Sequence, residues 1–185
     1  YKGLLGSKLL IDTYGYYSIY RDFISAVEIY QDPLTTAVKF NVPVNLTEDV
    51  KTYGGAFGLD YILGKYNING NVSYNKISDI PNSFINTFNT PELRYNIGLG
   101  NREVTKNVGF NLQYRWQERF TWNSTFGSGD VPAFGTFDGQ VSFKIPSINS
   151  TLKFGGSNLL NKYYSTSFGN PLVGAIYYTS ITFNP

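Results

Sequence analysis

The 185-residue sequence contains no cysteine and no histidine. Without cysteine the chain forms no disulfide and no thiolate metal site. Without histidine it lacks the commonest metal ligand and the commonest general base at neutral pH. The Asp, Glu and Lys residues follow no recognisable catalytic spacing. We therefore expect a protein that is not an enzyme and that has no catalytic residues, no metal site and no cofactor.

Charged residues and long apolar runs are also scarce. Asp, Glu, Lys and Arg make up 15% of the chain, against about 25% in ordinary globular proteins. No stretch approaches the roughly 18 consecutive apolar residues that a membrane-spanning helix requires, and the mean hydropathy is −0.21. The net charge is +2, with the basic residues scattered along the chain. These features exclude a helical membrane protein and give no reason to expect nucleic acid as a partner.

Aromatic residues and glycine, by contrast, are abundant, with 16 Tyr, 14 Phe and 19 Gly. Many aromatic residues, little charge and no long apolar run fit a chain that alternates apolar and polar side chains. In such a chain one face of each strand can meet lipid while the other meets water. The composition therefore favours an all-β fold that crosses a membrane as strands.

Alternation along the chain is the strongest signal. Residues 93–100 are apolar at odd positions and polar or glycine at even positions, and residues 66–75 and 108–123 alternate similarly, with Glu118 as the exception in the last segment. Because successive strand side chains point to opposite faces, each segment has one apolar and one polar face. We place Glu118 beyond the lipid. The pattern predicts about nine strands: residues 1–5, 9–19, 53–63, 66–75, 93–100, 108–123, 136–145, 151–159 and 173–183.

The connections between these segments give a second, independent signal. Short links at residues 6–7, 64–65, 102–106 and 146–150 alternate with long links at residues 32–47, 80–91, 127–135 and 161–171. Outer-membrane barrels combine short periplasmic turns with long outer loops. A soluble β-protein, in which the aromatic residues would form a core, has no reason to keep this order. The last strand is then expected to run toward the periplasm.

Aromatic side chains are expected near both ends of the strands, where they would form two interface belts. The outer belt would contain Tyr17, Phe23, Tyr53, Tyr74, Trp116, Phe120 and Trp122, and the inner belt Tyr61, Tyr66 and Phe143.

About nine strands do not make a closed wall. An open edge would leave unpaired backbone N–H and C=O groups in hydrocarbon, and bacterial single-chain barrels have even strand numbers. The first strand is also short, and the sequence opens at Tyr1 without a signal peptide. We therefore expect residues 1–185 to be the C-terminal portion of a longer, exported barrel protein.

Residues 152–164 (LKFGGSNLLNKYY) resemble the penultimate-strand signature of TonB-dependent outer-membrane receptors of the Bacteroidetes type. Residues 1–23 resemble a mid-barrel hairpin of the same group, so the resemblance covers essentially the whole chain. The signature block contains Asn158, Leu159, Asn161, Tyr164 and Pro171. Its asparagines are expected to shape a turn through side-chain-to-backbone hydrogen bonds.

The resemblance implies a barrel of about 22 strands with an N-terminal plug, of which this chain supplies roughly the last nine. It implies active import of a siderophore, cobalamin, glycan or peptide across the bacterial outer membrane. A passive porin, or a structural barrel within a larger envelope complex, is the alternative. The implied partners are outer-membrane lipid, the upstream plug and strands, TonB and a surface lipoprotein. Phe183 corresponds to the aromatic C-terminal assembly signal, although Asn184 and Pro185 follow it.

Charged residues at inward positions are the best candidates for function. In a plugged barrel they would pair with the plug or face the substrate path, and the alternative is simple solvation of the lumen. These candidates are Asp12, Asp60, Arg94, Arg115, Arg119, Asp138 and Lys144. The outer-loop aromatic residues Phe84, Phe88, Tyr163 and Tyr164 are candidates for stacking on a ligand.

Overall fold

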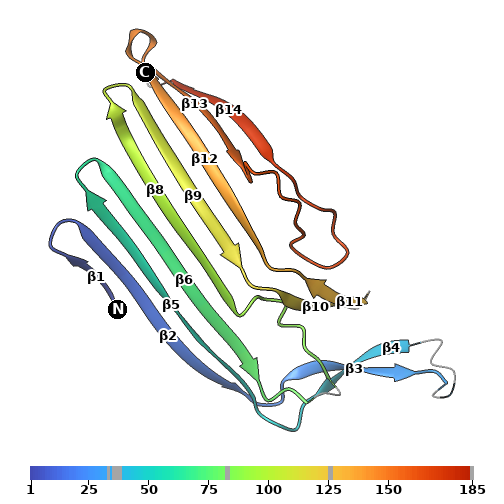
Figure 1. The fold of residues 1–185 in the computed structure, drawn as a ribbon. Helices are drawn as coiled ribbons and strands as arrows, with labels where there is room; N and C mark the ends of the chain where they lie inside the picture. The colour runs from blue at the N-terminus through green and yellow to red at the C-terminus, as the bar shows by residue number, and fades with distance from the viewer. Residues whose placement is uncertain (33, 35–38, 82–83, 125–126, 184–185) are drawn as a thin grey trace.

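The computed structural model describes residues 1–32, 34, 39–81, 84–124 and 127–183 and has the expected all-β, antiparallel fold (Figure 1). One large sheet has the strand order β1-β2-β5-β6-β8-β9-β12-β13-β14. Its strands are β1 (Lys2–Leu5), β2 (Leu9–Tyr20), β5 (Val50–Leu63), β6 (Tyr66–Ser78), β8 (Leu93–Thr105), β9 (Val108–Gln117), β12 (Phe134–Ile145), β13 (Ser150–Ser157) and β14 (Ile176–Phe183). Each of the nine expected strands has a counterpart in this sheet. No helix in the described ranges has the length and hydropathy to cross a membrane.

Short and long connections alternate, as the sequence predicted. The links β1–β2, β5–β6, β8–β9 and β12–β13 are short and lie at one end of the sheet, here called the short-turn edge (Figure 1). The long links lie at the opposite end, here called the long-loop edge. β14 ends at the short-turn edge, where Phe183 pairs with Ser150. Residues 33, 35–38 and 82–83 of the long links, and residues 184–185, lie outside the described residues.

The long links contain strands that the sequence analysis missed. β3 (Ile24–Tyr30) pairs with β4 (Lys39–Asn45) and with β7 (Phe84–Ile85) in a small sheet at the long-loop edge. A second hairpin is formed by β10 (Phe120–Ser124) and β11 (Gly127–Val131). The outer connections thus carry ordered structure of their own.

The prediction of one continuous strand over residues 108–123 is wrong. β9 ends at Gln117, and Phe120 begins β10 in the separate hairpin. Gln117 pairs with Arg94 at the start of β8 and with Phe134 at the start of β12. Neither neighbouring strand therefore extends beyond this level. After one more bond, from Glu118 N to Leu93 O at 2.9 Å, the chain has no ladder partner in the large sheet. Glu118 therefore marks the end of the strand.

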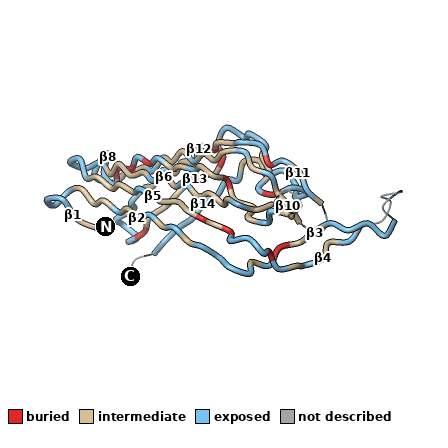
Figure 2. The backbone as a smooth tube through the Cα atoms, turned by 90° about the horizontal axis from the view of Figure 1, so that it is seen from below, coloured by how far each residue is buried: buried red, intermediate tan, exposed pale blue. Residues whose placement is uncertain are grey.

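The large sheet has no conventional core. Among the described residues the buried apolar side chains are Leu46, Val50 and Val131, all near the long-loop edge. The sheet instead exposes apolar side chains such as Ile97, which is 56% exposed, and most of the chain in Figure 2 is exposed or intermediate. An apolar face of this kind is stable when it is covered by hydrocarbon.

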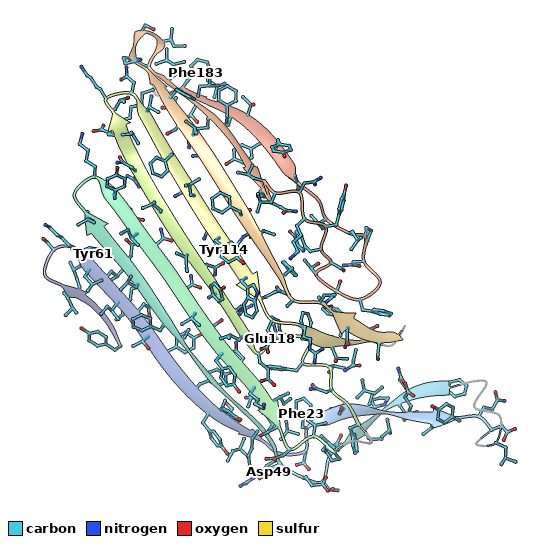
Figure 3. The ribbon with its side chains drawn as sticks, viewed as in Figure 1. Phe23, Asp49, Tyr61, Tyr114, Glu118 and Phe183 are labelled. Atoms are coloured by element: carbon cyan, nitrogen blue, oxygen red, sulfur yellow. The ribbon has the colours of Figure 1, made fainter. Side chains whose placement is uncertain are left out.

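Aromatic side chains gather near the long-loop ends of the strands. On the apolar face, the rings of Tyr95 and Trp116 stack with centroids 5.3 Å apart, and Tyr53 lies 6.5 Å from Tyr74. In Figure 3 Tyr61 lies toward the opposite, short-turn edge. Phe23, Phe120 and Trp122 are the corrections to the expected belts. Phe23 lies between β2 and β3, and Phe120 and Trp122 lie in β10, so none of the three is on a strand of the large sheet.

Candidate functional site

The polar face of the large sheet brings most of the charged candidates together. The strand registers put Asp60, Gln113 and Asp138 in one lateral row, through Asp60↔Asn69, Asn69↔Gly98, Gly98↔Gln113 and Gln113↔Asp138. Side chains two residues apart share a face. The same registers therefore place six candidates on this face: Asp12, Asp60, Arg94, Arg115, Asp138 and Lys144.

Arg119 is the exception among the seven candidates. It lies between β9 and β10, outside the large sheet, because the ladder ends just before it. Its side chain is exposed. The expected lumen-facing position of Arg119 on a continuous strand is therefore corrected.

Hydrogen bonds between neighbouring strands order the polar face. Asn96 Nδ2 donates to Asn71 Oδ1 at 2.8 Å, and Arg94 Nε donates to Ser73 Oγ at 3.0 Å. Near the end of the chain, the Tyr178 hydroxyl donates to Gln140 Oε1 at 2.9 Å. Amides and hydroxyls can both donate and accept, so this surface suits water or another polar surface equally well.

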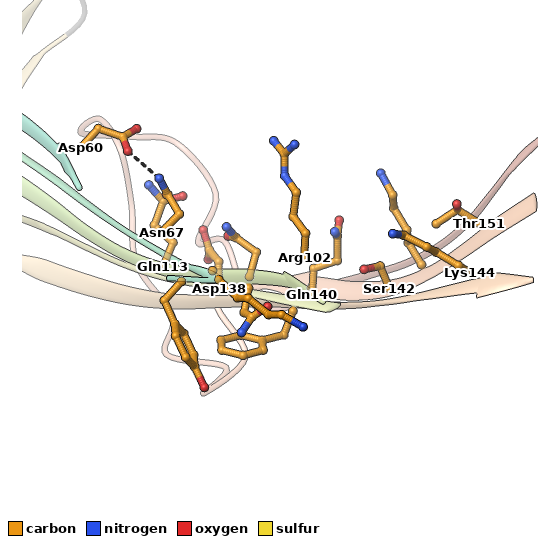
Figure 4. Close-up of a pocket in the computed structure, with 18 of the residues that line it drawn as sticks. Asp60, Asn67, Arg102, Gln113, Asp138, Gln140, Ser142, Lys144 and Thr151 are labelled. Atoms are coloured by element: carbon orange, nitrogen blue, oxygen red, sulfur yellow. Dashed lines mark hydrogen bonds between the residues drawn. The ribbon is translucent and has the colours of Figure 1, made fainter. Parts of the chain in front are cut away.

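A hollow of about 1140 Å³ lies over the half of this face nearer the short-turn edge (Figure 4). Asp60, Gln113, Asp138, Gln140 and Lys144 line it, together with three cations that sequence reasoning did not single out, Lys65, Arg102 and Lys153. Arg102 was assigned to a turn, although β8 continues to Thr105. Lys153 lies in the predicted strand over residues 151–159, where apolar and polar residues alternate least regularly. Its polar position between Leu152 and Phe154 was the available signal.

The closest ion pair on this face joins Arg115 and Asp138, with 2.6 Å between Arg115 Nη2 and Asp138 Oδ2. The Asp138 side chain is 18% exposed, whereas that of Arg115 is 47% exposed. Asp138 also accepts a hydrogen bond from the backbone N–H of Asn158 at 2.8 Å. It thus connects β9, β12 and the end of β13.

Replacing Asp138 with alanine should therefore lower the free energy of unfolding by about 2 kcal/mol, because it leaves the Asn158 N–H and the Arg115 guanidinium without their acceptor. Asp138→Asn keeps an acceptor for Asn158 and removes the charge, so it should cost about 1 kcal/mol. Denaturant unfolding of the full-length receptor in lipid vesicles measures both. Equal losses from the two variants would contradict the role given to the Asn158 hydrogen bond.

The signature block builds the turn that follows β13. The Asn158 side chain is buried, with 1% exposure, and its backbone is left-handed with φ of 53°. Its Nδ2 donates to Lys162 O at 2.8 Å, and its Oδ1 accepts from Lys162 N at 3.1 Å. Asn161, also left-handed, accepts from Ala175 N at 2.9 Å. These bonds agree with the turn-shaping role expected of the block.

Apolar contacts complete this turn. A Cβ atom at Gly139 or at Gly156 would lie 2.9 Å from a methyl group of Leu159, so Leu159 occupies space that the two glycines leave free. Tyr164 forms a bridge with Val173, and its ring stacks on that of Phe134 at 4.2 Å. Pro171 lies exposed in the loop before β14.

The four outer-loop aromatic residues differ in how far they are already packed against the rest of the protein. Phe84 is part of β7 opposite Val27, Phe88 is half-buried, and Tyr164 is packed on Phe134. Tyr163 is 64% exposed. Among these four expected stacking residues, Tyr163 is the most accessible to a ligand. The described residues contain no group of three or more Asp or Glu positioned to hold a metal ion.

Comparisons with known proteins agree with this architecture. A family model described as "TonB dependent receptor-like, beta-barrel" matches residues 1–159. No curated protein sequence matches the chain. Similar solved structures include the copper transporter OprC, which has 18% identity and a TM-score of 0.71 over 95% of this chain and 29% of that one. The FrpB iron transporter from Neisseria meningitidis (F3-3 variant) has 15% identity and a TM-score of 0.70 over 98% and 30%. The siderophore receptor PiuA from Acinetobacter baumannii has 14% identity and a TM-score of 0.64 over 96% and 27%.

Proposed function

The chain belongs to the TonB-dependent receptor-like β-barrel family of the Gram-negative outer membrane, and on this premise we propose that it forms part of the wall and outer loops of an active nutrient transporter. The two-faced sheet is the observation that carries the proposal. Its apolar face matches the lipid-facing surface of a barrel, and its polar face matches a water-filled or plugged lumen.

The rest of the barrel would come from the rest of the polypeptide. The chain spans about 30% of the length of the solved structures it resembles. Within the described residues, β1 and β14 each pair on one side only, and lipid tolerates no unpaired edge. Further strands would close the wall, to about 22 in all, and an N-terminal plug would fill the lumen.

The proposed substrate class is a scarce nutrient such as a siderophore, cobalamin, glycan or peptide. The similar solved structures are named as transporters or receptors for copper, iron and a siderophore. This chain has no histidine, cysteine or methionine. A metal recognised through imidazole or sulfur would therefore receive those ligands from the rest of the polypeptide.

Energy for transport would be supplied by TonB acting on the plug. The TonB-contacting segment would lie outside this chain, and a surface lipoprotein is a further proposed partner at the long-loop edge. In this arrangement the chain is not the part that TonB acts on. It forms part of the wall around the plug, and its outer loops face the substrate.

The proposal is tested by deleting the gene for the full-length receptor and measuring which nutrients then remain in the growth medium. We expect at least one compound to be left unconsumed, and deletion of TonB should reproduce that defect. A passive porin would still supply the compound without TonB. In planar bilayers the purified porin would also show a steady open conductance, whereas a plugged receptor would not.

A further inference from the structure

The short-turn edge of the large sheet carries an excess of positive charge. The short turns and the strand ends beside them comprise residues 1–12, 60–67, 100–111, 140–153 and 178–183. These ranges contain seven lysine or arginine residues and three aspartate or glutamate residues, whereas the rest of the chain contains eight and ten. The chain is therefore basic at the short-turn edge and slightly acidic elsewhere.

Most of this positive charge is not neutralised by neighbouring side chains. Lys2 is paired with Asp12 at 3.2 Å, and Lys144 is paired with Glu103 at 2.7 Å. Within the described residues the other five cations of this edge form no ion pair. An anionic partner from outside the chain would therefore meet cations that have no competing carboxylate partner.

Cations next to the apolar face at the opposite, long-loop edge have partners within the chain. Lys51 is paired with Asp79 at 2.8 Å, and Lys76 is paired with Glu92 at 3.3 Å. Both lysines lie near the outer ends of their strands, where the loops supply the carboxylates. The unneutralised charge of the short-turn edge is therefore not a general feature of strand ends in this sheet.

Three of the four short turns carry a lysine at the tip. Lys8 lies in the β1–β2 turn, Lys65 in the β5–β6 turn and Lys106 in the β8–β9 turn, and all three are exposed. Neighbouring hairpins are two strands apart, so at about 4.8 Å per strand the lysines start roughly 10 Å from one another. This spacing is close to the Debye length of about 8 Å in physiological salt, so neighbouring lysines act together on an anionic surface.

The turn lysines also lie directly beyond the lipid-facing part of the sheet. Lys8 is followed by Leu9, and Lys65 lies in the turn between Leu63 and Tyr66, which pair with each other on the apolar face. Leu63 is 52% exposed, so lipid would cover it. No spacer therefore separates the hydrocarbon level from the lysines, and a lysine in such a position extends its ammonium group to the headgroup level.

We propose that Lys8, Lys65 and Lys106 bind the phosphate groups of anionic phospholipids in the periplasmic leaflet of the outer membrane. Short turns lie on the periplasmic side of such barrels. Lysine binds phosphate as a point charge, and basic residues at this level are attracted to an anionic membrane surface. The turns are two or three residues long, so the headgroups are the anionic surface within their reach.

The three contacts would fix the depth of this part of the wall in the membrane. The inference goes beyond the proposed function, because it requires the outer-membrane location of the family and neither a substrate nor TonB. It also concerns the rim of the wall and not its polar face. Lys8 and Lys106 do not line the hollow, whereas Lys65 borders it.

Fluorescence quenching at the β8–β9 turn of the full-length receptor tests this proposal. Residues 1–185 contain no cysteine, so Asn107→Cys attaches a fluorophore beside Lys106 once any cysteines elsewhere in the polypeptide are replaced by serine. The receptor is placed in vesicles of equal parts phosphatidylglycerol and phosphatidylcholine. One of the two lipids carries a nitroxide quencher near the headgroup end of its acyl chain.

We expect nitroxide-labelled phosphatidylglycerol to quench about fivefold more strongly than nitroxide-labelled phosphatidylcholine, because the lysines concentrate the anionic lipid at the turns. Replacing Lys8, Lys65 and Lys106 with glutamine should make the two lipids quench equally. Replacing all three with arginine should keep the preference. The pair Lys8→Gln and Lys106→Gln should also lower it, although neither residue lines the hollow.

The matched control removes three exposed cations from the long-loop edge through Arg21→Gln, Arg119→Gln and Lys162→Gln. It changes the net charge by the same amount and should leave the preference unchanged. A preference that survives the three glutamine substitutions at the turns, or that the control removes equally, would overturn the inference. So would a fluorophore that neither lipid quenches, because the turns would then face another surface. The growth experiment above tests transport independently of all these outcomes.

Discussion

Replacing Ile97 with arginine should destabilise the membrane-embedded receptor by about 2–4 kcal/mol, the cost of a charged side chain on the lipid face of a barrel near mid-bilayer. Ile97 is 56% exposed and lies on the apolar face between Gly70 and Tyr114. Its neighbour Asn96 lies on the polar face and is hydrogen-bonded to Asn71. Asn96→Arg should therefore cost far less than Ile97→Arg.

Denaturant unfolding of the full-length receptor in lipid vesicles measures both variants under the same conditions. The comparison is internal, because the two positions are adjacent in β8 and receive the same side chain. Comparable losses would show that the two faces have been assigned wrongly. A loss confined to Asn96→Arg would reverse the assignment.

Asn158→Ala should cost about 3 kcal/mol, because it removes the two side-chain hydrogen bonds to Lys162 and places a non-glycine residue without a stabilising side chain at positive φ. The residue is 1% exposed, so water does not replace the lost partners. Denaturant unfolding in lipid vesicles measures the size of the stability loss. Faster proteolysis of the β13–β14 loop would show that the loss is located at this turn.

Two further variants separate the causes of this loss. Asn158→Gly relieves the backbone strain but not the hydrogen bonds, so it should cost about 2 kcal/mol. Asn111→Ala changes an exposed asparagine of the polar face and should stay within about 0.5 kcal/mol. If Asn158→Gly were as stable as the native protein, the hydrogen bonds would not be what holds the turn.

The strands of the large sheet could be predicted because lipid imposes a strict rule on them. Residues 93–100 must alternate if one face meets hydrocarbon, and the pairings of Tyr95, Ile97 and Leu99 with apolar or glycine partners in β6 show that they share that face. The order of short and long links was predictable for the same reason. The order follows from short turns on one side of the membrane and long loops on the other, rather than from the turn propensity of the local sequence.

Other features depend on neighbouring strands and could not be read from one segment. β9 ends at Gln117 because β8 and β12 both begin at that level, whereas apolar alternation continues through Phe120 and Trp122. The outer sheet joins β3 to β7, which lie far apart in the sequence. Arg102 continues the polar positions of β8, but the sequence analysis ended this strand at residue 100, because apolar alternation stops there while β8 runs on to Thr105.

The central claim is that the odd positions of β8 meet lipid and the even positions do not. Spin labels placed one at a time at residues 94–99 of the full-length receptor in nanodiscs measure this directly, through collisions with oxygen, which concentrates in lipid, and with a water-soluble nickel chelate. The account predicts high oxygen accessibility at 95, 97 and 99 and low oxygen accessibility at 94, 96 and 98. A profile without this two-residue period, or a label at 97 shielded from both reagents, would contradict it.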